Sequence, residues 1–104
     1  MAQFDVYRNL SRARVIIPFV LVIQRERYDD SRYRVVVPLI LRTELRMTDK
    51  YLNPAFMIEG TEVVMDPIQT ASIPVASLGP KVDNLAKSYT IIVRAIDELI
   101  APGK

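Results

Sequence analysis

The sequence predicts a mainly β protein with one C-terminal helix, and three observations support this class. Two runs of β-branched and aliphatic residues, at 15–24 and 33–41, have the composition of buried strands. Residues 82–99 instead place apolar side chains three or four positions apart, which is the spacing of a helix face. The chain has 104 residues, enough for one domain and too few for two. We therefore expect a single domain over residues 1–104.

The first strand is predicted over residues 3–8, where apolar and polar side chains alternate. Phe4 and Val6 then share one face of the strand, and Asp5 and Tyr7 share the other. This is the pattern of a half-buried strand.

The next two predicted strands each contain a proline, which cannot donate a hydrogen bond to a neighbouring strand. We expect the first to begin at about Phe19, with a bend at Pro18, and the second, at 33–41, to be interrupted at Pro38. Polar loops rich in turn-forming residues connect the strands, at residues 9–14 and 25–32.

The middle of the chain predicts a hairpin after a short irregular or helical segment at 42–49. Residues 56–59 and 62–66 flank Gly60 and Thr61, which we assign to a two-residue turn with a positive φ at the glycine. A further strand is expected at about 68–74.

The predicted helix opens at Pro80 and ends before Pro102 and Gly103. Such an apolar stripe is usually core, although a partner groove has the same pattern. Three more apolar residues lie off the stripe and are candidates for a second contact surface: Ile91, Val93 and Ile100. The stripe itself comprises Val82, Leu85, Tyr89, Ile92, Ile96 and Leu99.

Missing residue types narrow the chemistry. The chain contains no Cys and no His, which excludes disulfides, thiolate nucleophiles, imidazole bases and ordinary zinc or haem sites. Catalysis would have to use carboxylates, Arg, Lys, Tyr, Ser or Thr, and no phosphate loop or nucleophile elbow is present. We predict no cofactor, no metal and no catalytic residue.

Composition also predicts partners. Half of the residues are hydrophobic, which is more than a globule of this size easily buries, so we expect an oligomer or a protein partner. The longest apolar run, residues 15–23, is too short to span a membrane, and residues 1–8 contain no apolar secretory segment. We expect a cytoplasmic protein with no membrane association.

Basic residues concentrate in the first half of the chain, which holds nine of the ten arginines. Arg8, Arg12 and Arg14 surround one predicted loop, and four more arginines flank the loop at 25–32. An arginine face suits phosphate or carboxylate groups, so a nucleic acid or an acidic protein is one interpretation. Solvated strand edges are the simpler one.

Two acidic pairs are candidates for function. Asp29 and Asp30 are adjacent, so they would point to opposite faces of a strand or into water in a turn, and neither arrangement is an acid–base pair. Asp97 and Glu98 lie at the helix C-terminus, where the macrodipole disfavours negative charge. Either the exposed end tolerates this cost, or a partner supplies the compensating charge.

The order of several short segments resembles the CcdB family of bacterial type II toxins. In the first half the matching segments are Gln3-Phe4-Asp5-Val6-Tyr7, Val22-Ile23-Gln24 and Val35-Val36-Val37-Pro38-Leu39. In the second half they are Leu52-Asn53-Pro54, Phe56 to Gly60, Met65 to Pro74, Leu78-Gly79 and Ala95-Ile96. The resemblance covers nearly the whole chain.

This resemblance implies a homodimer built on a bent antiparallel sheet, or SH3-like barrel, with a long C-terminal helix. It also implies a cognate antitoxin whose disordered C-terminal segment folds onto the toxin, with Arg8, Arg12 and Arg14 as a candidate antitoxin face. The implied target is the A subunit of DNA gyrase, trapped with cleaved DNA. Neither a catalytic step nor direct sequence-specific binding to nucleic acid is implied.

The chain departs from the family at the implied gyrase surface. The family tail Phe-Trp-Gly-Ile is replaced by Ile100, Ala101 and the residues after them, and Trp is a frequent interface anchor. An Ile-Ile pair corresponds to Arg27 and Tyr28, and an Asn corresponds to Asp97.

Three hypotheses follow from the resemblance and these departures. The first is a CcdB-like gyrase toxin that uses the five altered positions. The second is a diverged homologue that dimerises and binds antitoxin without poisoning gyrase. The third is a ribonuclease like the MazF and Kid toxins, which share the fold and cut RNA without His.

Overall fold

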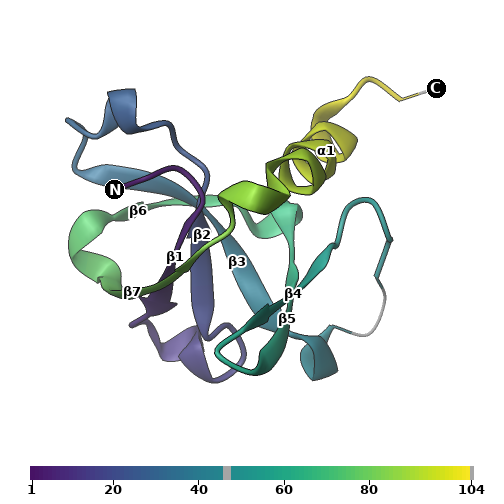
Figure 1. The fold of residues 1–104 in the computed structure, drawn as a ribbon, viewed down its shortest axis with the longest axis horizontal. Helices are drawn as coiled ribbons and strands as arrows, with labels where there is room; N and C mark the ends of the chain where they lie inside the picture. The colour runs from purple at the N-terminus through teal and green to yellow at the C-terminus, as the bar shows by residue number, and fades with distance from the viewer. Residues whose placement is uncertain (46–47, 104) are drawn as a thin grey trace.

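The computed structural model describes residues 1–45 and 48–103. Within these ranges it forms one seven-stranded antiparallel sheet followed by a helix (Figure 1). The mainly β class with a C-terminal helix is therefore confirmed. The elements are β1 (Asp5–Asn9), β2 (Phe19–Val22), β3 (Tyr33–Leu41), β4 (Ala55–Ile58), β5 (Thr61–Met65), β6 (Ala71–Pro74), β7 (Leu78–Asn84) and α1 (Tyr89–Ile100).

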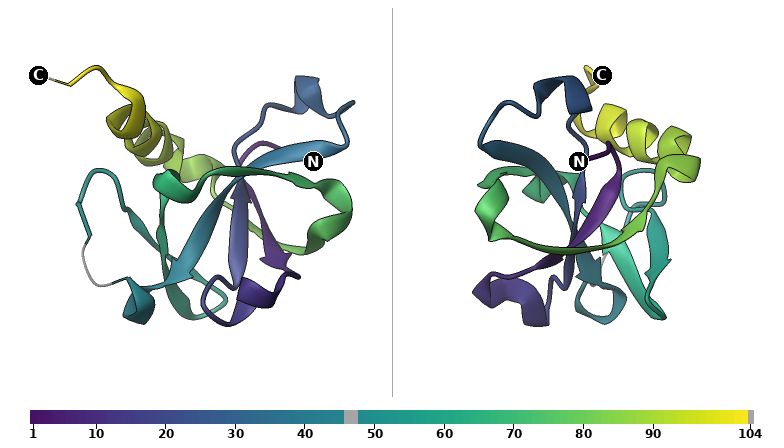
Figure 2. Two further views of the ribbon diagram at one scale, coloured as in Figure 1. Left: turned by 180° about the vertical axis from the view of Figure 1, so that it is seen from behind. Right: turned by 60° about the vertical axis from the view of Figure 1, so that its left-hand side comes forward.

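The sheet bends around β3, its longest strand. The strand order is β4-β5-β3-β2-β1-β7, and β6 also pairs with β3. One edge of β3 pairs with β2, while the other edge pairs with β6 along its first half and with β5 along its second. The sheet thus splits along one edge of β3 and curves into a half barrel (Figure 2).

β3 passes through Pro38 without the predicted interruption. β6 pairs as far as Val36 and β5 begins at Leu39, so Pro38 falls in the gap between these two neighbours. The Pro38 carbonyl accepts a hydrogen bond of 3.2 Å from the Asp66 amide at this gap. Because the nitrogen of a strand residue faces the same edge as its carbonyl, the missing N–H of Pro38 faces this gap and not β2.

The hairpin between β4 and β5 is confirmed, but its turn lies one residue earlier than predicted. Ile58 pairs with Thr61, so the two turn residues are Glu59 and Gly60. Both have positive φ, 50° and 77°, as a type I′ turn requires. Thr61 is β-branched and disfavours that conformation, which explains why it opens β5 instead.

The beginning of the predicted helix was wrong, because residues 78–84 form β7. This strand pairs with β1 and covers an edge that would otherwise be open, with register irregularities that accommodate Pro80 at the sheet margin. The helix begins only at Tyr89. Val82 and Leu85 still pack against the core, so the prediction that they face it is confirmed. The prediction that they belong to the helix was wrong.

Two smaller boundaries also differ from the predictions. The strand expected at about 68–74 begins at Ala71, because a 3-10 turn, η4 (Pro67–Gln69), precedes it with Asp66 as its N-cap. In the segment at 42–49, Arg42–Glu44 forms a 3-10 turn, and residues 46–47 lie outside the described residues.

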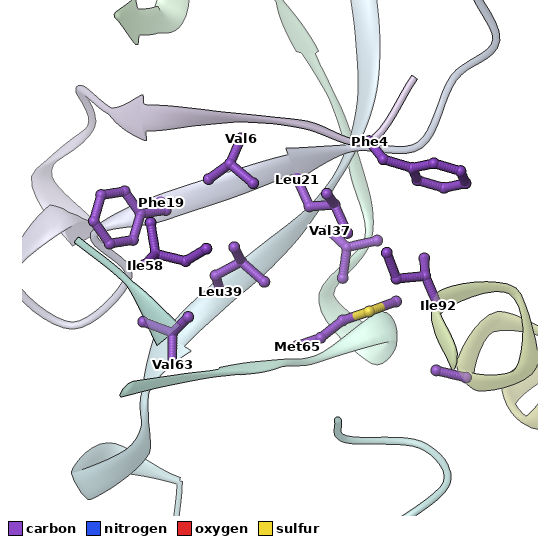
Figure 3. Packing of buried hydrophobic residues seen from close by; sticks show 11 residues of the cluster. Phe4, Val6, Phe19, Leu21, Val37, Leu39, Ile58, Val63, Met65 and Ile92 are labelled. Carbon is purple, nitrogen blue, oxygen red and sulfur yellow. The ribbon is translucent and has the colours of Figure 1, made fainter. Parts of the chain in front are cut away.

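Both faces of β1 are buried, so the half-buried interpretation was also wrong. Val6 belongs to the main core, which fills the concave side of the sheet and includes Ile92 and Ala95 of α1 (Figure 3). Tyr7 belongs to a second cluster on the opposite face with Val20, Val22 and Val36. Residues 5–7 are therefore buried on whichever face they lie, and Arg8 is the exposed residue of β1.

Candidate functional site

Arg27 and Tyr28 lie together on an exposed loop between β2 and β3. They belong to a 3-10 turn, η2 (Glu26–Tyr28), and the Arg27 guanidinium lies 5.3 Å from the centroid of the Tyr28 ring. Gln24 positions this turn, because its side-chain amide donates to the Tyr28 carbonyl and its side-chain oxygen accepts from the Val35 amide, both at 3.0 Å. Tyr28 is 54% exposed and available to a partner.

The side chain of Arg34 holds this loop in place through hydrogen bonds, a role that the sequence did not predict. Its side chain is buried and donates to the carbonyls of Ser31, Tyr33 and Asp29 at 2.6, 2.8 and 3.1 Å. Its Nε lies 3.3 Å from the Asp29 carboxylate. Arg34 is therefore not a solvated edge residue, and Asp29 does not point freely into water. The signal in the sequence was an arginine inside a β-branched strand.

Asp97, Ile100 and Ala101 lie at the far end of α1. Ile92 and Ala95 hold the middle of the helix on the core, whereas the last turn is exposed, with Ile100 67% accessible. The Ala101 amide donates to the Asp97 carbonyl at 2.7 Å and closes the helix. The last turn contains no basic residue, so the unfavourable macrodipole at Asp97 is uncompensated within the helix.

These five candidates form two patches within one chain. In Figures 1 and 2 the η2 loop and the last turn of α1 lie along the same side of the molecule, near its two ends. The η2 patch presents a guanidinium stacked beside a ring, and the α1 patch presents aliphatic side chains beside a carboxylate. Each arrangement suits binding to a protein surface.

The three arginines of the other candidate face differ in their surroundings. Arg8, on β1, forms an ion pair with Glu59 of the β4–β5 turn and lies 5.8 Å from the centroid of the Phe19 ring. Arg12 and Arg14 lie on an exposed 3-10 turn, η1 (Arg12–Val15), whose N-cap is Ser11. Arg8 therefore links β1 to the β4–β5 turn, whereas Arg12 and Arg14 are exposed on η1, where Arg14 also donates to the Ser11 carbonyl at 3.1 Å.

A cleft that the sequence did not predict opens beside η1. Its volume is about 310 Å³, and its floor is the outer face of the sheet, with Val20, Val36 and Ile73 among the lining residues. Asn9 and Ser11 contribute polar groups. The available signal was the apolar stretches 15–23 and 35–41, in which successive residues are all apolar although only alternate residues can face one core.

Two further results concern metal binding and membrane insertion. Within the described ranges, no three acidic side chains gather closely enough to hold a metal ion. The helix of the described chain is too short to be a membrane span.

Comparison with known proteins identifies the family. The family model described as CcdB protein matches residues 3–102. A search of the curated proteins found no match.

Proposed function

The chain belongs to the CcdB family, and from this premise we propose that it is the toxin of a type II toxin–antitoxin module. Family membership over nearly the whole chain is the observation that supports this function most directly. In this proposal the protein binds the A subunit of DNA gyrase in the cytoplasm and traps the complex with cleaved DNA. It acts by binding, so no catalytic residue is assigned.

The target surface in this proposal comprises Arg27 and Tyr28 on the η2 loop together with Asp97, Ile100 and Ala101 on α1. The support is their exposure and their position on one side of the fold. A stacked Arg–Tyr pair and an exposed aliphatic turn are common components of protein interfaces. A large partner that approaches this side would meet both patches.

Homodimer formation and an antitoxin complete the proposal. Ile91, Val93 and Ile100 are 52, 42 and 67% exposed, which is more aliphatic surface than one short helix usually leaves in water. We assign part of it to a second copy of the chain. The apolar cleft beside Arg12 and Arg14 fits an acidic, partly apolar antitoxin segment.

The test combines growth with a gyrase assay. Expression should arrest a host with sensitive gyrase and spare an otherwise identical host with resistant gyrase, and the purified protein should stabilise cleaved DNA. Ile100→Glu should abolish both effects. Met57→Glu is the control, because Met57 is 62% exposed and lies on β4, outside the proposed target surface. Equal killing of both hosts would contradict a gyrase target.

A second candidate function is supported by the tail, where Ala101 stands at the position of the family's Trp. Loss of such an anchor costs about 2 kcal/mol, or roughly thirtyfold in affinity. The protein would then dimerise and bind antitoxin without poisoning gyrase. Capture of an antitoxin peptide by a protein that neither arrests growth nor traps cleaved DNA would support this candidate. RNA cleavage in metal-free buffer would contradict both.

A further inference from the structure

Two basic side chains share one aromatic ring beside α1. The Arg94 guanidinium carbon lies 3.9 Å from the centroid of the Tyr51 ring, and the Lys50 Nζ lies 4.8 Å from it. Arg94 belongs to α1, whereas Lys50 and Tyr51 belong to the turn before β4. Both cations are therefore attracted to the same ring, and two like charges held by one ring repel each other unless an anion lies near both.

The turn that presents Lys50 and Tyr51 is fixed by its own hydrogen bonds. The Asp49 carboxylate accepts from the amides of Leu52 and Tyr51 at 3.0 and 2.9 Å, and these bonds lower the pKa of Asp49. The Asn53 side-chain amide donates to the Met65 carbonyl of β5 at 3.1 Å. The turn is therefore tied to the sheet. Backbone amides hold the Asp49 carboxylate, and the nearby Lys50 charge also lowers its pKa, although the two groups form no ion pair among the described residues.

A cleft opens around this pair of cations. Lys50, Tyr51, Pro54, Ala55, Ile91 and Arg94 line it, in a volume of about 580 Å³. None of these lining residues, all from the described part of the chain, is acidic. Among the described residues, the carboxylates that form ion pairs are Asp5, Asp29 and Glu59, and none of them pairs with Lys50 or Arg94. The cleft is cationic and has an aliphatic wall.

We propose that this cleft is a carboxylate-binding site for an acidic peptide segment of a partner protein. The Asp or Glu carboxylate lies between the Lys50 ammonium and the Arg94 guanidinium, and a neighbouring apolar side chain packs on Ile91 and Pro54. Two cations and no acidic residue supply the charge complementarity. The inference does not depend on gyrase as the target.

The same geometry argues against a nucleic acid. Proteins that bind single strands stack bases on exposed aromatic rings, and Tyr51 already has a guanidinium 3.9 Å from its centroid. The aliphatic part of the wall also suits peptide side chains better than phosphodiester groups. These two observations favour the peptide.

Tryptophan fluorescence gives a direct test, because the chain contains no Trp. The probe is the blocked peptide Leu-Glu-Trp-Glu-Leu, and its Gln counterpart is the uncharged control. The acidic peptide should bind in low salt and weaken as salt is added, and the Gln peptide should bind at least about tenfold more weakly. Equal binding of the two peptides, or no binding of either, would overturn the proposal.

Variants locate the site. Lys50→Gln and Arg94→Gln should each weaken the acidic peptide about tenfold, whereas Tyr51→Phe, which keeps the ring, should leave binding within about twofold. Lys87→Gln is the matched control, because Lys87 is exposed and does not line the cleft. Circular dichroism checks that each variant is folded.

Two other occupants would overturn the assignment to a peptide partner. In a competition experiment, single-stranded DNA and a competing glutamate peptide are each added to the bound fluorescent peptide. Displacement by the DNA at the lower concentration would indicate that the site binds a nucleic acid. A change in sedimentation coefficient of Arg94→Gln without peptide would indicate that a second copy of the chain fills the cleft. Loss of peptide binding in Lys87→Gln alone would place the site elsewhere.

Discussion

The Asn84 side-chain amide donates a hydrogen bond of 2.7 Å to the carboxylate of Asp5, which joins the last residue of β7 to the first residue of β1. The same carboxylate accepts from the Ala2 amide at 2.9 Å and from the Tyr7 hydroxyl at 3.1 Å, and it lies 3.1 Å from Lys81 Nζ. Asp5 is 2% exposed. A buried charge of this kind depends on all of its donors.

We predict that Asp5→Asn destabilises the protein and weakens its response to acid. Burial raises the pKa of Asp5, but the bonds from Asn84, Lys81, Ala2 and Tyr7 outweigh it, and the pKa falls below the ordinary 3.8. The stabilisation is therefore complete above the unfolded pKa and is lost as the pH falls through the lower folded pKa. Urea unfolding at pH 7 should show a loss of about 2 kcal/mol, with a flatter decline below pH 5.

Asp30→Asn is the control for this experiment, because Asp30 is exposed. It should leave the free energy of unfolding at pH 7 within about 0.5 kcal/mol. An acid response in Asp5→Asn as steep as in the parent chain would show that the stabilising carboxylate is a different one.

Tyr7 should make the protein sensitive to alkali. Burial, followed by the nearby negative charge and hydrogen bond of Asp5, raises the pKa of Tyr7 to about 12. Because the folded pKa exceeds the unfolded value of about 10, stability is retained below pH 10 and is lost as the pH rises toward 12. Tyr7→Phe removes this group, so the unfolding free energy of the variant should fall less between pH 9 and 11.5 than that of the parent chain. Tyr33→Phe is the control, because Tyr33 is exposed, and its unfolding free energy should fall as much as that of the parent.

How far the sequence predicts the fold is clearest in the last third of the chain. Val82 and Leu85 continue the helical spacing of α1 yet lie in β7 and the turn after it. A three- and four-residue spacing over a few residues does not distinguish a helix from a strand whose register is broken by irregularities. What decided the outcome was the open edge of β1, a tertiary requirement that no local pattern contains.

The candidate surfaces were predictable only in part. Exposure of Tyr28 and Ile100 follows from their place in a loop and at a helix end, so the sequence places them at the surface. The buried role of Arg34, by contrast, depends on three carbonyls that the loop turns toward it. The Tyr51–Arg94 contact joins residues 43 positions apart, and neither residue lies in a motif that would have paired them.

Gly79 should resist substitution because β7 approaches β1 closely at this residue. A Cβ there would lie 2.9 Å from the Arg8 Cβ and 3.0 Å from the Arg8 carbonyl oxygen. The backbone oxygen cannot move aside easily, so Gly79→Ala should cost about 1 to 3 kcal/mol. Gly103→Ala would meet nothing within 4 Å and should be neutral. Thermal unfolding of the two variants tests this, and equal midpoints would contradict the close approach.

Ile92 should be the residue that holds α1 on the sheet. It is fully buried and points toward the core that contains Met65 (Figure 3), whereas the neighbouring Ile91 is 52% exposed. Ile92→Ala should therefore lower the free energy of unfolding by about 3 kcal/mol. Ile91→Ala removes the same atoms from a surface position and should cost less than about 1 kcal/mol. Denaturant unfolding of both variants gives the comparison.

Ala101→Trp tests whether the end of α1 is still the gyrase contact. Ala101 is exposed and follows the closed last turn, so an indole at this position has room to reach a partner without entering the core. If this surface still contacts gyrase, the affinity for the gyrase A subunit should rise about thirtyfold, because the indole restores an aromatic anchor to the interface. Thr90→Trp, at the exposed start of α1, adds the same side chain away from the patch and should change affinity less than about twofold. Equal affinities of the two variants in a binding titration would show that the contact has moved from the tail.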